Sequence, residues 1–153
     1  MRRPLPAATL FSIAVATLVL AASAPAAAPQ RGATYSGSVT TPRGAIAISF
    51  RLSANGGRVE DVRLAALPIY CAGNGPPGTP TIVFKSAVVS AGGRFASPGE
   101  DMLGSGPLKG SVAARLTVTG TFASGGRVHG TLTTTFGGAA RECGGHSPYS
   151  ARV

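Results

Sequence analysis

The sequence contains few of the residues on which acid–base and metal chemistry depend. Of 153 residues only 12% are charged, five are acidic, two are histidine and none is tryptophan. Carboxylates and imidazoles are the usual general acids, general bases and metal ligands, so few candidates exist for such roles. A length of 153 residues corresponds to about one domain, which excludes an α/β barrel or a two-domain dinucleotide enzyme of ordinary size.

Residues that interrupt helices are, by contrast, abundant. The chain has 12 prolines and 22 glycines, all of the glycines at or after Gly32, while 44% of its residues are hydrophobic. A segment of this composition is a poor helix former, and it is too apolar for a disordered chain. We therefore divide the sequence into a glycine-free leader and a glycine-rich body.

The leader has the layout of a secretory signal peptide. Arg2 and Arg3 precede an apolar stretch from Leu5 to Leu20, and small residues follow it. This stretch is shorter than the ~20 apolar residues of a membrane span and contains polar residues, which favours cleavage over anchoring. We expect a signal peptide over residues 1–26, one secreted β-rich domain over residues 27–153, an extracellular location and no membrane span after cleavage.

The body contains two cysteines, Cys71 and Cys143. In an oxidising compartment, two cysteines most simply form one disulfide. Cys143 and His146 also form a Cys-x-x-His string, similar to that of electron-transfer copper domains. Such a site would need His129 as well, would leave Cys71 unpaired, and usually has a methionine downstream, which is absent here. The sequence favours a Cys71–Cys143 bridge, and it predicts no metal and no cofactor.

Alternation of apolar and polar residues predicts a first hairpin. Apolar residues stand at every second position from Ile46 to Leu52, which is the period of a half-buried strand. A turn follows, and Arg58 to Leu67 reads as the return strand with a bulge at Glu60 and Asp61. Arg51 then faces an acidic residue. The expected apolar pairs are Leu52 with Val59, Phe50 with Val62, and Ile48 with Leu64.

A second hairpin near the C-terminus is joined by the loop Ser124-Gly125-Gly126, in which glycine suits the left-handed backbone that such a loop requires. One of its faces is mostly apolar and the other is a threonine ladder, with Thr121 opposite His129. We take the polar face as the candidate binding surface, although the β propensity of threonine alone predicts the same array. Its residues are Arg115, Thr117, Thr119, Arg127, His129, Thr131 and Thr133.

Between the hairpins we expect a loop over Pro68–Pro80, a strand near Thr81–Val89, and a second loop over Ser97–Pro107. About seven to nine short strands with turns between them are typical of an all-β domain. The predicted architecture is an antiparallel β-sandwich with one disulfide, and the alternative is a small β-barrel.

The remaining motifs predict no catalytic residue. No G-x-S-x-G string is present, and neither histidine has a nucleophile beside it in the sequence. Glu100 and Asp101 fall in the second expected loop, where a solvated position is favoured over a calcium site. The formal net charge of +9 suits an anionic partner, such as a cell-envelope glycan or anionic polymer. The arginines are scattered and have few aromatic neighbours, which argues against nucleic acid.

The C-terminal half contains the strings Val118–Phe122, Gly126–Leu132 and Tyr149–Arg152, together with Cys143-Gly144. These strings resemble a group of small secreted, single-disulfide, β-rich proteins of high-GC Gram-positive bacteria. The resemblance implies an exported β fold with structural cysteines, and it implies no activity. An aromatic residue, often tryptophan, occupies the place of Tyr149 in that group, so tyrosine is a mild departure.

From these observations we expect a non-catalytic extracellular or cell-envelope module with a binding or structural role. The alternative is a small secreted hydrolase or a copper-type metal-binding protein that uses His129 or His146.

Overall fold

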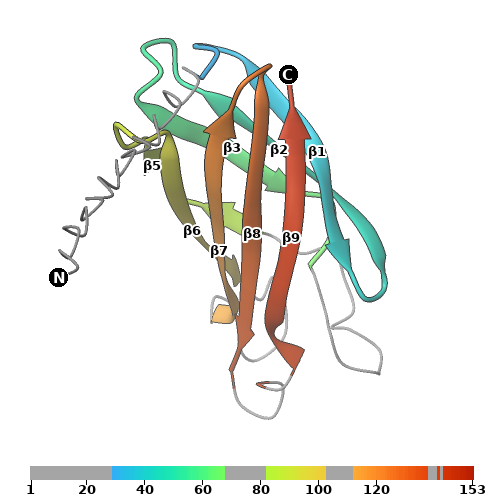
Figure 1. Ribbon diagram of the computed structural model, residues 1–153. Helices are drawn as coiled ribbons and strands as arrows, with labels where there is room; N and C mark the ends of the chain where they lie inside the picture. The colour runs from blue at the N-terminus through green and yellow to red at the C-terminus, as the bar shows by residue number, and fades with distance from the viewer. Residues whose placement is uncertain (1–28, 68–81, 103–111, 138–140, 142) are drawn as a thin grey trace, which may run out of the picture.

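The computed structural model describes residues 29–67, 82–102, 112–137, 141 and 143–153 (Figure 1). These residues form an all-β structure without an α-helix. The strands are β1 (Thr34–Thr41), β2 (Gly44–Leu52), β3 (Arg58–Leu64), β4 (Ile82–Phe84), β5 (Ala87–Val88), β6 (Arg94–Met102), β7 (Val112–Ala123), β8 (Arg127–Phe136) and β9 (Gly145–Arg152).

All nine strands belong to one antiparallel sheet in the order β4-β6-β7-β8-β9-β1-β2-β3-β5. Figure 1 shows β7, β8 and β9 side by side, with β1 and β2 turning away behind them, so that the sheet curls into a half-barrel. The β-sandwich expected from the sequence is not confirmed. Pairing continues without a break from β6 to β3, and no second sheet is present among the described residues.

The segment from β4 to β5 connects the two edges of the curled sheet. β4 pairs with β6 and β5 pairs with β3, although only Lys85 and Ser86 separate these two strands. The backbone N–H of Lys85 donates to the carbonyl of Pro98 on one side, and the hydroxyl of Ser86 is 2.7 Å from Nη2 of Arg58 on the other. The strand expected near Thr81–Val89 is therefore two short strands, because its two halves bind different partners.

Both predicted hairpins are present. In the second, Thr121 pairs with His129, Thr119 with Thr131 and Thr117 with Thr133, as expected, and the loop places Gly125 and Gly126 at φ 72° and 64°. In the first, Leu52 pairs with Val59 and Ile48 with Leu64 across a register shift. Asp61 has the positive φ of 52° at the bulge. The first return strand ends at Leu64, three residues earlier than expected, and Arg51 forms ion pairs with both Glu60 and Asp61.

The second expected loop is partly wrong, because its first residues belong to β6. Ser97 is buried, and its hydroxyl donates to the carbonyl of Lys85 at 2.6 Å. Glu100 forms an ion pair with Arg115 on β7, and Asp101 is buried. The prolines and glycines of this segment predicted a loop. Pro98 directly precedes Gly99, the first residue of β6 that pairs with β4, and at that position a missing N–H is tolerated. The first expected loop, Pro68–Pro80, lies outside the described residues.

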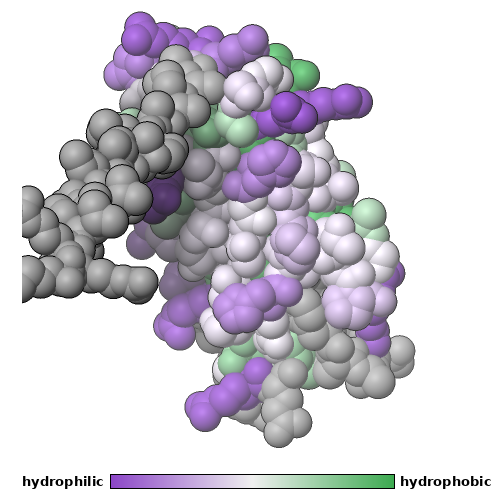
Figure 2. All heavy atoms as spheres, in the orientation of Figure 1, coloured by the Kyte–Doolittle hydropathy of each residue, from purple (hydrophilic) through white to green (hydrophobic). Residues whose placement is uncertain are grey.

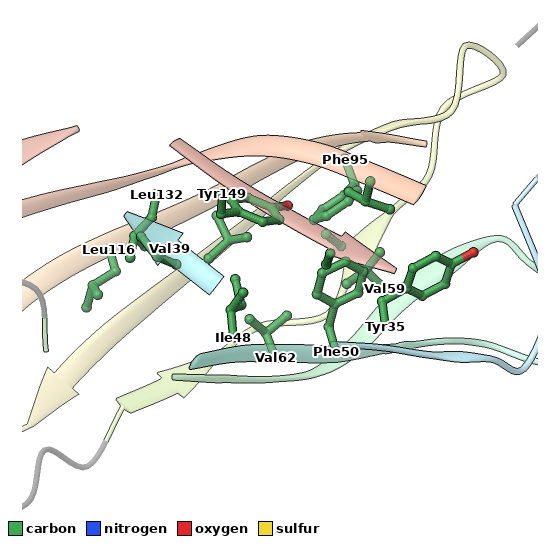
Figure 3. Close-up of a cluster of buried hydrophobic side chains, with 14 of the residues drawn as sticks. Tyr35, Val39, Ile48, Phe50, Val59, Val62, Phe95, Leu116, Leu132 and Tyr149 are labelled. Atoms are coloured by element: carbon green, nitrogen blue, oxygen red, sulfur yellow. The ribbon is translucent and has the colours of Figure 1, made fainter. Parts of the chain in front are cut away.

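The two faces of the sheet differ in polarity because side chains alternate along every strand. The convex outer face is largely polar, as Figure 2 shows for the side formed by β7, β8 and β9. The concave inner face is apolar. Figure 3 shows Ile48, Phe50 and Val62 pointing from β2 and β3 toward Tyr149 of β9.

Five aromatic rings pack together in this interior. The rings of Tyr35 and Phe50 stack with centroids 5.4 Å apart, and Phe95, Phe122 and Tyr149 contact them edge-on or tilted. Contacts of this kind add to the stability that their buried area provides. The inner face is therefore a packed core, and any ligand surface must lie elsewhere.

Candidate binding surface

The structure places all seven residues of the predicted surface on the outer face of β7 and β8. Their cross-strand register agrees with the expectation, since Thr117 and Thr119 lie opposite Thr133 and Thr131. The two ends of the ladder differ in charge, however. Arg115 at one end is 3.6 Å from the carboxylate of Glu100, so its charge is already partnered. Arg127 at the other end takes part in none of the ion pairs among the described residues.

Several threonine hydroxyls of the ladder are also engaged within the sheet. The hydroxyl of Thr119 donates to the carbonyl of Thr131 at 3.2 Å. Thr135, which follows Thr133 on the same face of β8, donates its hydroxyl to the carbonyl of Arg115 at 3.3 Å. Thr133 shares a 3.0 Å hydrogen bond with Nδ1 of His146. The Arg115 end also lines a hollow, of about 360 Å³, but Arg115 is paired there with Glu100, which lines the same hollow. At the Arg127 end the guanidinium has no ionic partner among the described residues, so this end is the better candidate for an anionic ligand.

A hollow of about 340 Å³ lies at the Arg127 end of the outer face. It is formed where β8, β9 and β1 run side by side. The residues around it are Ser36, Gly37, Ser38, Arg127, His129, Ser150, Ala151 and Arg152. The lining contains three serine hydroxyls, one imidazole and two guanidinium groups, and it contains no carboxylate.

Two arginines stand side by side in the lining of this hollow. Arg127 of β8 pairs directly with Arg152 of β9 in the antiparallel register. Like charges in directly opposite positions destabilise a sheet. Nε of Arg127 donates to the carbonyl of Ser124 at 3.3 Å, which holds this side chain, but no described acid neutralises either guanidinium. A bound anion would remove this repulsion, so the electrostatics of the hollow favour a negatively charged ligand.

Sequence reasoning found two residues of the hollow, Arg127 and His129, and missed the others. Ser36, Ser38, Ser150 and Arg152 come from β1 and β9, whose pairing joins the two ends of the domain. A signal for them does exist in the sequence. Polar residues alternate with apolar ones in both segments, which indicates one outward face on each strand.

The two histidines lie too far apart to act together. His129 pairs with Ser150, whereas His146 pairs with Thr133, four residues further along β8. Four residues of extended strand span about 13 Å, so one metal ion cannot bind both. Within the described part of the chain, no three His, Cys, Asp or Glu residues gather as metal ligands, and no hydrogen bond joins His129 to a hydroxyl. The copper-type and hydrolase alternatives thus gain no support from this geometry.

Cys143 lies half-buried just before β9. Its expected partner Cys71 and the expected signal peptide over residues 1–26 lie outside the described residues. The disulfide and the export of the chain therefore stay predictions.

Comparison of the chain with protein-family models, curated proteins and solved structures gives no match. Within the described residues, no helix has the length and the apolar character that are needed to span a membrane.

Proposed function

We propose that this protein is an extracellular or cell-envelope binding module, without catalytic activity, that takes an anionic polymer on its outer face. The observation that carries the proposal is the pair Arg127 and Arg152, cross-strand neighbours that line a hollow together with serine hydroxyls and no described acid. Guanidinium groups bind phosphate and carboxylate oxygens through paired N–H donors, and such charge-assisted bonds are the strong ones.

The shape of the site favours a polymer over a small molecule. The hollow is open and lies on the convex side of a sheet, whereas small-molecule sites are concave and mostly apolar. Ser36, Ser38 and Ser150 can each donate and accept hydrogen bonds, which suits both the hydroxyls of a glycan and the oxygens of an anionic group. The positive net charge of the chain would attract such a polymer over a longer range.

The leader supports the proposed location. Its charged start, apolar stretch and small residues have the layout of a secretory signal peptide. Outside the cell membrane, the abundant polyanions are polymers of the envelope and its surroundings, and a basic, hydroxyl-lined surface suits them.

The proposal is tested by measuring retention on three immobilised polymers: poly(glycerol phosphate), polygalacturonate and neutral dextran. We expect the protein to bind one or both anionic polymers and not dextran. The variant R127Q/R152Q should bind at least about tenfold more weakly, since each lost charge-assisted bond is worth about 1.5–3 kcal/mol.

The matched control is Arg141→Gln. Arg141 is exposed in the connection between β8 and β9, at the opposite end of these strands from Arg127 and Arg152. R141Q removes one positive charge, whereas R127Q/R152Q removes two. If R141Q weakens binding as much per charge removed as the double variant does, net charge alone explains retention and the proposed site is wrong.

A further inference from the structure

Five outward-facing residues stand in one row across five neighbouring strands. Arg127 pairs with Arg152, Arg152 with Ser36, Ser36 with Ser49, and Ser49 with Arg63. The row runs from β8 through β9, β1 and β2 to β3, perpendicular to the strands. It has positive charge at both ends and small hydroxyl side chains between them.

Three hollows lie along this row, and neighbouring hollows share lining residues. A second hollow, of about 300 Å³, lies on the far side of β1 from the first, and both are lined by Ser36 and Gly37. A third, of about 230 Å³, shares Ser49 and Arg63 with the second. Because β1 contributes only Ser36 and Gly37 where the first two hollows meet, no large side chain of β1 stands between them.

At its β3 end the row carries the positive charge of Arg63, and an acidic residue lies near it. Arg63 is exposed and belongs to none of the ion pairs among the described residues. Asp61 lines the third hollow together with Arg63 and is 3.6 Å from Arg51, which also pairs with Glu60. From β9 to β3 the row takes three steps between strands, which at about 4.8 Å each separates Arg152 from Arg63 by about 14 Å.

We infer that the ligand is a linear phosphate-bearing polymer that lies across the strands and occupies two anion subsites. This inference rests on the proposed function and specifies its ligand. One phosphate sits between Arg127 and Arg152, where two guanidinium groups and the nearby serine hydroxyls match the several oxygens of a tetrahedral anion. A second phosphate sits at Arg63, and Ser36 and Ser49 contact the uncharged part of the polymer between the two.

The polymer links its phosphates through polyols or sugars instead of nucleosides. Single-stranded nucleic acids bind to grooves in which bases stack on exposed aromatic rings. None of the described aromatic side chains is exposed; all are buried or half-buried. Hydroxyl side chains suit polyol and sugar groups instead.

The experiment measures the affinity of the wild-type protein for glycerol-phosphate oligomers of increasing length, by calorimetry at one fixed salt concentration. Once an oligomer can span about 14 Å, it engages both subsites, and the second binding step becomes intramolecular. The affinity should then rise by about a hundredfold or more. Single-stranded oligonucleotides of equal charge serve as the nucleic-acid arm, and they should bind more weakly at every length.

Three variants separate the subsites. Arg63→Gln should abolish the rise with length. Arg152→Gln should weaken binding at every length, and Arg141→Gln should do neither. The thermal unfolding of each variant is recorded beside its affinity, so that a folding defect is recognised.

Different failures have different meanings. If Arg63→Gln and Arg141→Gln behave alike while Arg152→Gln weakens binding, the second subsite is wrong and the proposed function stands. Retention on polygalacturonate without any binding of glycerol-phosphate oligomers overturns the phosphate assignment alone. If neither anionic polymer binds, the proposed function fails together with this inference.

Discussion

The ring of Tyr149 on β9 lies across Gly130, its partner on β8, inside the curl of the sheet. A Cβ atom at Gly130 would lie 2.5 Å from Cε1 of Tyr149, and one at Gly120 on β7 would lie 2.5 Å from its hydroxyl oxygen. Phe95 on β6 covers Gly120 from the other side. Two adjacent glycines therefore form a floor on which two aromatic rings lie, which is the arrangement known to compensate for glycine within strands.

This relationship predicts that Gly130→Ala destabilises the protein. The new methyl group would meet the Tyr149 ring and the backbone carbonyl of Thr119, so the strands must shift. Overpacking of this kind typically costs about 1–3 kcal/mol, which denaturant unfolding measures. Gly137→Ala is the control, because nothing lies within 4 Å of a Cβ at that position. Equal stability of the two variants would contradict the close packing described for Tyr149.

Tyr149 also predicts how stability depends on alkaline pH. Burial raises the pKa of Tyr149 well above its ordinary value, because the phenolate would lose its hydration. The unfolded chain ionises near pH 10, whereas the folded chain keeps this phenol protonated. The contribution of Tyr149 to the free energy of unfolding is therefore unchanged below about pH 10 and is lost progressively as the pH rises above it.

The measurement is denaturant unfolding of the wild type and of Tyr149→Phe from pH 8 to pH 12. The phenylalanine variant should lose less stability above about pH 10. The Tyr149 hydroxyl has no hydrogen-bond partner among the described residues, so at pH 8 the substitution should be neutral or stabilising by about 1 kcal/mol. A variant that is strongly destabilised at pH 8 would show that this hydroxyl does have a partner in solution.

The predicted disulfide has a direct test. The described part of the chain contains no free cysteine, which is consistent with a bridge between Cys143 and Cys71. Thiol counting on unfolded exported protein should find no free thiol before reduction and two thiols after it. Replacing both cysteines by serine should cost about 2–5 kcal/mol of unfolding free energy. Two reactive thiols in the unreduced material would show that the bridge is absent.

The arginine pair predicts that binding depends on the planar geometry of the guanidinium groups as well as on their positive charge. In R127K/R152K the positive charge stays, but the planar fork that binds two oxygens at once is lost. This variant should bind poly(glycerol phosphate) more weakly than the wild type, while the dependence of its affinity on salt concentration stays nearly the same. Full affinity in the lysine variant would indicate a diffuse electrostatic attraction instead of a defined site.

The hairpins could be predicted from the sequence because their pairing is local. The glycine loop and the bulge each fix a register, and a single shift would turn the apolar side chains outward. The pairing of β9 with β1 could not be predicted in this way, since it joins Tyr149 to Val39 across most of the chain without a connecting turn. Six of the eight residues that line the first hollow come from these two strands, and so Ser36, Ser38, Ser150 and Arg152 were missed.

The acidic residues show a second limit of local reasoning. Proline and glycine beside Glu100 and Asp101 are typical of a loop, yet these residues continue β6 because β4 and β7 flank it. Long-range pairing thus overrode the local preference, and it neutralised Arg115 by placing Glu100 beside it. The threonine ladder lost one of its two charged ends for this reason.

The most direct test of the anion site is an NMR titration of the isotope-labelled protein with poly(glycerol phosphate). We predict that the largest backbone amide shifts occur around the first hollow, with Ser36, Ser38 and Ser150 among the affected residues. The Nε–H signals of Arg127 and Arg152 should shift as well. The backbone amides of Arg115 and Thr117, on the partnered part of the ladder, should change little. Shifts concentrated at Arg115 and Thr117, or spread evenly over all exposed arginines, would contradict a site at Arg127 and Arg152.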